Sequence, residues 1–488
     1  MALMTDRGAR SVGLVLALGG LLVVVDTTVT VVAVPAIVAD LDSTLPVVQW
    51  VTSGYLLGVV AVIPIAGWAA NRFGARRVYL AALVIFTLFS ALCALAWSAG
   101  SLIAFRVLQG LGGGLLNPVG QAIGLRAVPR SQRGRMMSLL GLPVLIGPPL
   151  GPPLSGWLVD VASWRWIFLV NVPVGVVAVV LCTLVIPRFD ASASGGPVDR
   201  LGLALLSGGA VSLVLGCTVL GDAGEATASA LAGLLAGAVL LAAFVRRALR
   251  IERPLIELRL LRHRPLGAGV AVLGCFGAAY FGAMSVLPIF VQAVRGDPAI
   301  LAGLVGLPQA LAVGLTLQVA TRLVDRVKPR RIVLTGTSLG LLGVLALLVA
   351  TSADAPYPVI ATAAAVVGAG SGATLMPAMT AAVRDLEGAD TARGTTLMAL
   401  AQQLAAALGV AVVTTTLTVL VAVRAPGLPG DGGLAAMLAL DPALRAALAP
   451  QLAAAVGGAY GAAAVLMALA TLAVVIGSRE SRPATKSR

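Results

Sequence analysis

The chain has 488 residues, of which 59% are hydrophobic and only 11% are charged, and its mean hydropathy is +1.01. Soluble domains carry about 25% charged residues, so this composition excludes an ordinary globular protein and predicts many membrane-spanning helices. The formal net charge is +14, but no basic patch is interleaved with aromatic residues, so nucleic acid is not an expected partner.

Long apolar runs predict fourteen spans. In chain order they lie at about 12–35, 48–70, 78–98, 101–124, 136–160, 166–187, 201–220, 227–245, 266–292, 300–321, 332–352, 357–381, 395–423 and 452–477. With this assignment, 29 of the 34 Lys and Arg residues fall on the side of the N-terminus and four fall on the opposite side. Because positively charged loops stay in the cytoplasm, we expect both termini to be cytoplasmic. We also expect membrane lipids as partners, with the positive charges in contact with anionic lipids.

Apart from Asp160 at the outer end of the fifth span, two charged residues lie inside the predicted spans, Asp26 in the first and Arg106 in the fourth. A charge at that depth costs about 2.5–3.5 kcal/mol or more, so an intramembrane acid indicates a functional site. At 1.5 Å per residue both lie in the outer half of the membrane, roughly 13 Å and 8 Å from the outer helix ends. If the two helices are neighbours, the residues can pair or share a cavity. The alternative is structural, with Asp26 capping a kink and Arg106 bonding carbonyls.

A repeat divides the chain into two halves. The segments GWAANRFGARR (67–77) and TRLVDRVKPRR (321–331) both follow the second helix of a six-helix block, if the seventh and eighth spans are an insertion. This predicts an all-α fold with a six-helix bundle at 1–187, a linker with two inserted helices at 188–264, and a second bundle at 265–488. Two bundles around a midplane cavity are typical of alternating-access carriers. The basic segment 246–264 fits either an amphipathic helix on the inner leaflet or a solvated connector.

The fifth span contains GPPLGPPLSGW (147–157), whose four prolines remove backbone donors, so we expect this helix to bend or break. Its glycines, Gly147, Gly151 and Gly156, allow another helix to approach closely. The result is either a deformable outer gate or a static kink.

Enzymatic and metal sites are not expected. The four cysteines lie in apolar runs without metal-ligand spacing. GTSLG (336–340) matches a nucleophile-elbow pattern, but it lies in an apolar run and the only histidine, His263, is in a distant linker.

Five segments of the chain resemble signatures of the major facilitator superfamily, and specifically of its fourteen-helix drug:proton antiporters. They are VDTTVTVVAVP (25–35), GWAANRFGARR, LIAFRVLQGLGGG (102–114), GPPLGPPLSGW and SWRWIFLVNVPVG (163–175). The resemblance implies proton coupling at Asp26 and Arg106. It also implies a gating loop with Gly67, Asn71, Arg72, Gly74, Arg76 and Arg77, and an antiporter motif with Gly147, Pro148, Gly151, Pro152 and Gly156. The internal repeat adds a second-half loop motif with Asp325, Arg326, Arg330 and Arg331.

The chain departs from these signatures at three positions. Asn71 stands where an aspartate is usual, Thr30 where an asparagine is usual, and Pro152 where a second glycine is common. Asn71 still offers a hydrogen bond but brings no charge, so the gate either is weaker or depends on Asp325.

These features predict a proton-coupled exporter of lipophilic small molecules such as drugs or antibiotics. It would be a monomer driven by the proton-motive force, without a cofactor. Because Asp26 is the only acid within the spans apart from Asp160 at the outer end of the fifth, neutral or monocationic substrates are expected. Candidate cavity residues are Tyr55, Tyr280, Phe281, Met284, Gln309 and Met376. The composition, with only two lysines, suggests a bacterial inner membrane. A metabolite facilitator or importer, and a non-transporting receptor or lipid-modifying enzyme, are the alternatives.

Overall fold

A computed structural model describes residues 6–129, 132–187, 198–223, 227–252, 254–323, 327–384, 386, 388–425, 437 and 440–476. All regular elements within these residues are helices. Two predicted motif residues, Asp325 and Arg326, lie outside the described residues. So do most of the outer loop after Arg424 and the C-terminal segment.

The first half begins with α1 (Asp6–Asp40), a helix of 35 residues. It continues with α2 (Leu45–Val62), the short helices η1 (Ile63–Ile65), α3 (Ala66–Ala69) and η2 (Ala70–Gly74), then α4 (Ala75–Ala94) and α5 (Ala99–Ala127). It ends with α6 (Arg133–Leu140), α7 (Leu142–Val161), α8 (Trp166–Leu169) and α9 (Asn171–Val185). Helices α1, α2, α4, α5, α7 and α9 pack into one bundle.

A hairpin of α10 (Arg200–Ala223) and α11 (Ala228–Arg250) follows. The second half comprises η4 (Leu258–Arg262), α12 (Arg264–Ile289), η5 (Phe290–Val294), α13 (Ala299–Leu323), α14 (Pro329–Ser352), α15 (Tyr357–Ala382), α16 (Gly388–Arg424) and α18 (Pro442–Ile476). Helices α12–α16 and α18 pack together as a second bundle.

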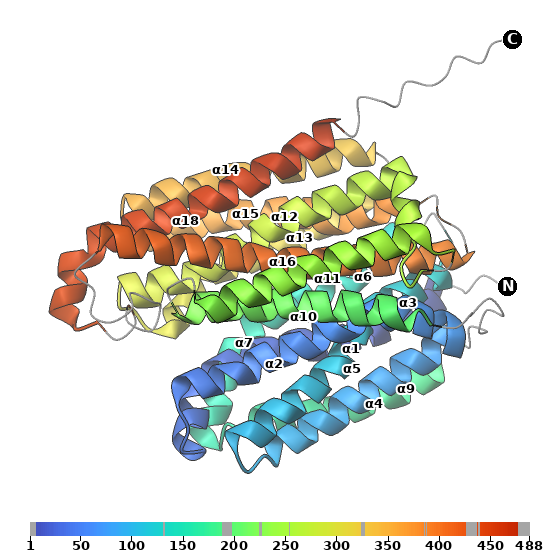
Figure 1. Cartoon of the computed structure of the whole chain (residues 1–488), viewed down its shortest axis with the longest axis horizontal. Helices are drawn as coiled ribbons and strands as arrows, with labels where there is room; N and C mark the ends of the chain where they lie inside the picture. The colour runs from blue at the N-terminus through green and yellow to red at the C-terminus, as the bar shows by residue number, and fades with distance from the viewer. Residues whose placement is uncertain are drawn as a thin grey trace, which may run out of the picture.

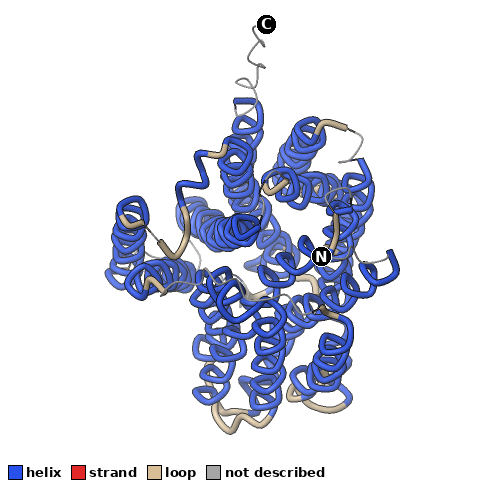
Figure 2. Tube along the Cα trace, turned by 90° about the vertical axis from the view of Figure 1, so that its right-hand side faces the viewer, coloured by secondary structure: helices blue, strands red, loops and turns tan. Residues whose placement is uncertain are grey.

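The two bundles lie one above the other in Figure 1, with the hairpin between them at the front. Helix α10 contacts both α2 of the first half and α16 of the second. Ser207 on α10 donates to the carbonyl of Ala61 at 2.7 Å, and Val60, Ala210 and Val214 form a small buried cluster. In the end-on view of Figure 2 the same pair stands out on the left. Helix α10 therefore bridges the two halves on one side of the molecule.

The described residues contain eleven helices that are long and apolar enough to cross a membrane. One of these stretches, Trp50–Ala94, holds two of the predicted spans, and Arg200–Gly216 is a shorter apolar helix. The chain is therefore a multi-pass membrane protein of the expected all-helical class. The count of fourteen spans stays a prediction.

The predicted loop at 71–77 is helical instead. The chain forms a π-helix over Ala70–Gly74 and continues directly into α4. Gly74 has φ of 87°, a backbone conformation that glycine adopts without strain. Ala70, Gly74 and Ala75 are buried, so packing against the bundle favours a helical connection over an extended loop.

Two other local features differ from the simplest expectation. Helix α7 runs without interruption through its four prolines, packed along α1, so of the two expected outcomes the break is absent and the bend stays a prediction. Helix α18 begins at Pro442, ten positions before the predicted start of the last span. The backbone N–H of Ala443 donates to the Asp441 carboxylate, which caps this helix, and Pro442 suits its first turn.

The basic linker also packs differently from an amphipathic membrane helix. Ile256 and Leu260 are buried in the main core cluster, and Leu255, Leu258 and Leu261 pack against that cluster. The apolar side of the linker thus faces the protein itself. This favours the interpretation of the segment as a connector over that of an amphipathic helix on the inner leaflet.

Candidate functional site

Helix α5 carries the arginine of the site and is placed by two local features. Ser98 and Ser101 form a reciprocal capping box at its N-terminus. Further along, Gly58 of α2 and Gly110 of α5 lie at the crossing of the two helices, where an added Cβ on either would collide with backbone carbonyl oxygens of the other helix. This close approach brings the α2 backbone within reach of the α5 side chains.

Asp26 and Arg106 form an ion pair between α1 and α5. The Arg106 guanidinium donates from Nη1 to Oδ2 of Asp26 at 2.5 Å, and both side chains are completely buried. The two charges foreseen inside the spans are thus neighbours. A buried pair of this kind is costly to desolvate and depends on further hydrogen bonds to its free lone pairs.

Those further bonds come from two amides. Gln109 donates to Oδ1 of Asp26 at 3.0 Å and Asn171 donates to the same atom at 2.8 Å. Gln109 also accepts from Arg106 at 2.8 Å, and Asn171 donates to the Ser90 hydroxyl at 3.1 Å. The carboxylate therefore accepts hydrogen bonds from three donors on three different side chains, one of them charged.

Arg106 has a second set of partners that does not involve the carboxylate. Its Nε donates to the carbonyl of Val51 at 3.1 Å, and its guanidinium lies 4.3 Å from the centre of the Tyr55 ring and 5.5 Å from that of Phe168. A desolvated cation–π contact is worth about 2 kcal/mol. The Nη2 group is buried and has no hydrogen-bond partner among the described residues, so within them the guanidinium has an unused donor.

Sequence reasoning missed Gln109, Asn171 and Ser90. Gln109 follows Arg106 by three positions and so lies on the same face of α5. Asn171 begins α9 and stands within SWRWIFLVNVPVG. Strongly polar side chains within predicted apolar spans were the available signal.

The three glycines of the antiporter motif differ in their contacts with neighbouring helices. A Cβ added at Gly147 would collide with Val24, and one at Gly151 would collide with Thr28, so both glycines let α7 contact α1. Ser155 adds a hydrogen bond to the Val29 carbonyl at 2.7 Å. Gly156 has no atom within 4 Å of its added Cβ. The close approach expected at Gly156 is therefore wrong for this conformation. Pro148 and Pro152 lie within the helix, but their side chains are not described.

The gating motif connects the ends of several helices. Asn71 accepts a hydrogen bond from Arg126, in the last turn of α5, at 3.1 Å, and Arg76 donates to the carbonyl of Thr183. Gly67 is buried, whereas Arg72 and Arg77 are exposed. In the second-half motif Arg330 and Arg331 are exposed at the start of α14.

The six candidate cavity residues do not form one cluster. Tyr55 belongs to the Asp26–Arg106 site and is buried under the guanidinium. Tyr280 and Gln309 meet in the second half, and Phe281 lies edge-on to Tyr280 with ring centres 5.2 Å apart. Met284 is 39% exposed, and Met376 is half-buried against the main core cluster.

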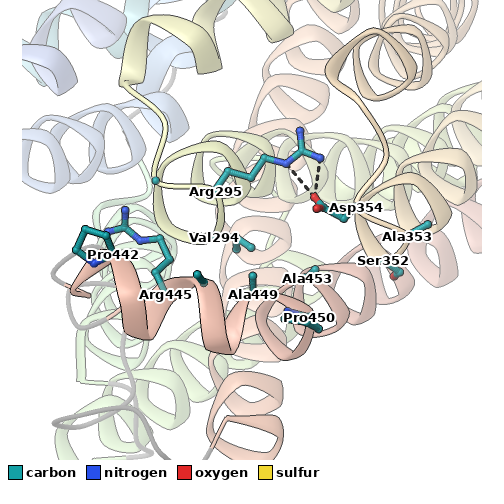
Figure 3. Close-up of a pocket in the computed structure, with 12 residues that line it drawn as sticks. Val294, Arg295, Ser352, Ala353, Asp354, Pro442, Arg445, Ala449, Pro450 and Ala453 are labelled. Carbon is teal, nitrogen blue, oxygen red and sulfur yellow. Dashed lines mark hydrogen bonds and ion pairs between the residues drawn. The ribbon is translucent and has the colours of Figure 1, made fainter.

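A cavity of about 620 Å³ lies in the second half, where η5 and α14 end and α18 begins (Figure 3). Arg295 and Arg445 line it, and Arg295 donates to Asp354 at 2.6 Å. Gly296 turns the chain there with φ of 74°. None of the predicted cavity residues lines this pocket, so it is distinct from the expected substrate site.

At the corresponding end of the first half, Asp40 accepts hydrogen bonds from Arg165 at 2.5 Å and from the Trp164 indole at 3.1 Å. These bonds, the one from Arg165 above all, lower the pKa of Asp40 from its usual 3.8. Arg165 also donates to the Ala96 carbonyl at 3.3 Å. The hydrogen bonds of Asp40 and Arg165 therefore connect the end of α1 to two neighbouring loops.

Comparison with known proteins finds one matching family profile and many related transport proteins. The Major Facilitator Superfamily profile matches residues 16–410. The "Multidrug resistance protein B homolog" of Mycobacterium tuberculosis is 40% identical over 417 residues, covering 85% of this chain and 77% of that protein. The "Putative multidrug resistance protein MdtD" of Escherichia coli is 32% identical over 402 residues, covering 82% and 84%.

Solved structures agree on the fold. The proton:xylose symporter XylE superimposes with a TM-score of 0.61 at 16% identity, covering 96% of this chain and 95% of XylE. The human organic anion transporter MFSD10 gives 0.60 at 15% identity, covering 94% and 99%. At these identities the likeness concerns the fold alone. Taken together, the profile match and the curated relatives establish that the chain belongs to the major facilitator superfamily.

Proposed function

We propose that this protein exports lipophilic small molecules, drugs or antibiotics among them, in exchange for protons. The buried Asp26–Arg106 site carries this proposal, because an acid at that depth is costly and is retained in membrane proteins mainly for function. Relatives named as multidrug resistance proteins support the substrate class. The division into 1–187, 188–264 and 265–488, a monomeric state, a bacterial inner membrane and cytoplasmic termini belong to the same proposal.

The first step is protonation of Asp26. In the present conformation the carboxylate has no exposed surface, and Arg106, Gln109 and Asn171 all donate to it. A proton therefore reaches Asp26 only when the helices around it move and water enters. Neutralising the carboxylate weakens its attraction to Arg106 and loosens the contact between α1 and α5.

Arg106 retains partners when Asp26 is neutral. The Val51 carbonyl, the Gln109 amide oxygen and the Tyr55 ring all remain within reach of the guanidinium. The cost of breaking the ion pair is therefore smaller than for a pair without other contacts. This second set of partners makes the pair reversible, which a proton carrier requires.

The proton gradient supplies enough free energy for efflux. One charge moving through 100 mV is worth about 2.3 kcal/mol, and each 1.4 kcal/mol sustains about a tenfold concentration ratio. The hydrogen bond from Arg126 to Asn71 and the contacts between Gly147, Gly151 and α1 are candidates for the parts that open and close.

The test is proton release from energised inside-out vesicles on adding a panel of lipophilic cations and antibiotics. We compare the native chain with Asp26→Asn at matched expression and with Asp40→Asn, which removes an exposed carboxylate near the end of the same helix. Release should occur in the native and Asp40→Asn proteins and be lost in Asp26→Asn. Asp26→Glu should retain part of it, because a titratable group remains.

Preserved release in Asp26→Asn would mean that the pair is structural and that protons take another route. Substrate transport without any proton movement in the native protein would indicate a facilitator.

A further inference from the structure

The second half contains a narrow apolar groove at the opposite end from the cavity of Figure 3. The groove has a volume of about 160 Å³ and lies between the beginnings of α12 and α14 and the ends of α15 and α18. Eleven of its twelve lining residues are Gly, Ala, Val or Pro, and the twelfth is Arg330. Sites for drug-sized ligands enclose about 300–1,000 Å³, so this groove is too small for such a ligand.

Small side chains create the groove. Gly269 lets α12 touch α15, because an added Cβ would lie 2.5 Å from the Cβ of Ala382. Beside this contact the helices present Ala268, Ala381 and Ala473, whose side chains are half-buried and too short to close the space between the helices. Packed apolar surfaces leave few voids, so a slender apolar chain that fills the groove gains van der Waals contacts.

The groove opens at the level of the membrane surface. Helices α12 and α14 begin two of the stretches that are long and apolar enough to cross a bilayer, Arg264–Val294 and Pro329–Ser352. The ends of such stretches lie where the hydrocarbon core meets the lipid headgroups. A molecule in the groove therefore has its apolar part among the helices and its polar part at headgroup level. With the orientation proposed above, this is the cytoplasmic leaflet.

The polar edge of the groove is positively charged. Arg330 is exposed and, within the part of the chain that the structure describes, its guanidinium has no hydrogen bond or ion pair. Lys328 and Arg331 beside it and Arg264 at the start of α12 are exposed as well. Clusters of Lys and Arg at the ends of membrane helices attract anionic lipid headgroups. The groove thus combines an apolar interior with a cationic edge.

Two other occupants fit this combination poorly. Drug-sized substrates exceed the volume of the groove, and cationic ones are repelled by Arg330 and its neighbours. The chain's own residues 477–488 carry four Lys and Arg residues and one Glu, so they are repelled as well. A phospholipid with an anionic headgroup satisfies both the interior and the edge. Because lipid tails are about equally apolar, the headgroup charge decides which lipid is bound.

We propose that this groove binds one anionic phospholipid, with an acyl chain between α12, α14, α15 and α18 and the phosphate on Arg330. The site is a single place on the protein, in contrast to the general attraction between basic loops and an anionic membrane. The bound lipid connects the ends of four helices and stabilises the second bundle against unfolding. Neither Asp26 and Arg106 nor any candidate cavity residue lines this groove.

The test measures the binding of two lipids with identical acyl chains to purified protein in detergent, by native mass spectrometry. Dioleoylphosphatidylglycerol is anionic, and dioleoylphosphatidylcholine is zwitterionic. Arg330→Gln removes the charge at the groove, and Arg331→Gln is the matched control, because it removes an exposed charge at the next position that does not line the groove. Ala381→Leu fills the groove, and Ala242→Leu, at an exposed position of α11, is its control.

The native protein should bind phosphatidylglycerol more tightly than phosphatidylcholine. Arg330→Gln should weaken phosphatidylglycerol binding about fivefold, the effect of one arginine near an anionic surface, and Arg331→Gln less than about twofold. Ala381→Leu should abolish the bound lipid, and Ala242→Leu should leave it unchanged. Added phosphatidylglycerol should also raise the unfolding temperature of the native protein but not that of Ala381→Leu.

Four results would overturn the proposal. Equal losses in Arg330→Gln and Arg331→Gln would indicate diffuse attraction, and unchanged binding in Ala381→Leu would mean that the lipid lies outside the groove. Displacement of the lipid by inorganic phosphate would assign the site to a free anion, and displacement by tetraphenylphosphonium would assign it to a cationic substrate. Because none of these measurements involves transport, their outcome is independent of the exporter function.

Discussion

Replacing Gly110 by alanine tests how the crossing of α2 and α5 builds the site. A Cβ at this position would collide with the carbonyl oxygen of Tyr55 and lie 3.1 Å from the backbone nitrogen of Val59. Both are backbone atoms of α2 and cannot move aside as a side chain would. The substitution should therefore push the two helices apart.

The expected cost combines three effects. Overpacking at a tight contact costs about 1–3 kcal/mol. Separating α2 from α5 also stretches the hydrogen bond from Arg106 to the Val51 carbonyl, and a bond from a charged donor is worth about 1.5–3 kcal/mol. Alanine in a helix offsets about 0.5–1 kcal/mol of this by its better propensity. The net loss of unfolding free energy should be about 2–5 kcal/mol.

The measurement is unfolding in mixed detergent micelles followed by circular dichroism. Gly156→Ala is the matched control, because no atom lies within 4 Å of its added Cβ, and its stability should change by no more than about 0.5 kcal/mol. Equal stabilities of Gly110→Ala and Gly156→Ala would refute the view that backbone contact at Gly110 positions Arg106.

Two further predictions concern the ion pairs. Asp26→Asn should destabilise the protein, because it leaves Arg106 charged and buried without its anion, but by less than the roughly 3–5 kcal/mol of a pair without other contacts, since Arg106 keeps the Val51 carbonyl, Gln109 and the Tyr55 ring. Adding Arg106→Gln should recover part of this loss in the same unfolding assay, and a double variant as unstable as Asp26→Asn would contradict the reasoning. Asp40 has a lowered pKa in the folded state, so its pairing with Arg165 stabilises the protein above its usual pKa of 3.8 and this contribution disappears as the pH falls through the folded pKa. The stability difference between native and Asp40→Asn proteins, under about 1 kcal/mol for so exposed a pair, should be present at pH 6 and shrink as the pH falls below 3.8, and a difference that does not change with pH would count against the pair.

The class of protein, most of its helices and two residues of the site could be predicted from the amino-acid order. Apolar runs and the placement of charges are one-dimensional properties, and they locate spans because the bilayer imposes a fixed length and excludes charge. Asp26 and Arg106 were identifiable because a charge inside an apolar run needs no knowledge of its neighbours to be conspicuous.

The helix boundaries could be predicted less well. The connection at 71–77 and the first ten residues of α18 are helical, although their composition suggested loops. The Asp441 cap and Pro442 were readable as a helix start, whereas the π-helix at Ala70–Gly74 depends on burial against the bundle, which a local pattern does not reveal.

The sequence by itself determined that this is a helical membrane protein with an acid and an arginine, Asp26 and Arg106, inside its apolar runs, because hydropathy and charge are written in the order of residues. Only the tertiary structure decided which side chains surround that pair. Gln109 and Asn171 donate to Asp26 from α5 and α9, separated from it by 83 and 145 positions. It also decided that Gly147 and Gly151 contact α1, whereas a Cβ added at Gly156 meets no atom of the described residues within 4 Å, and that α10 joins α2 to α16. The physical reason is that each of these contacts depends on how helices distant in the chain cross, and a crossing is set by the shapes of both partners together.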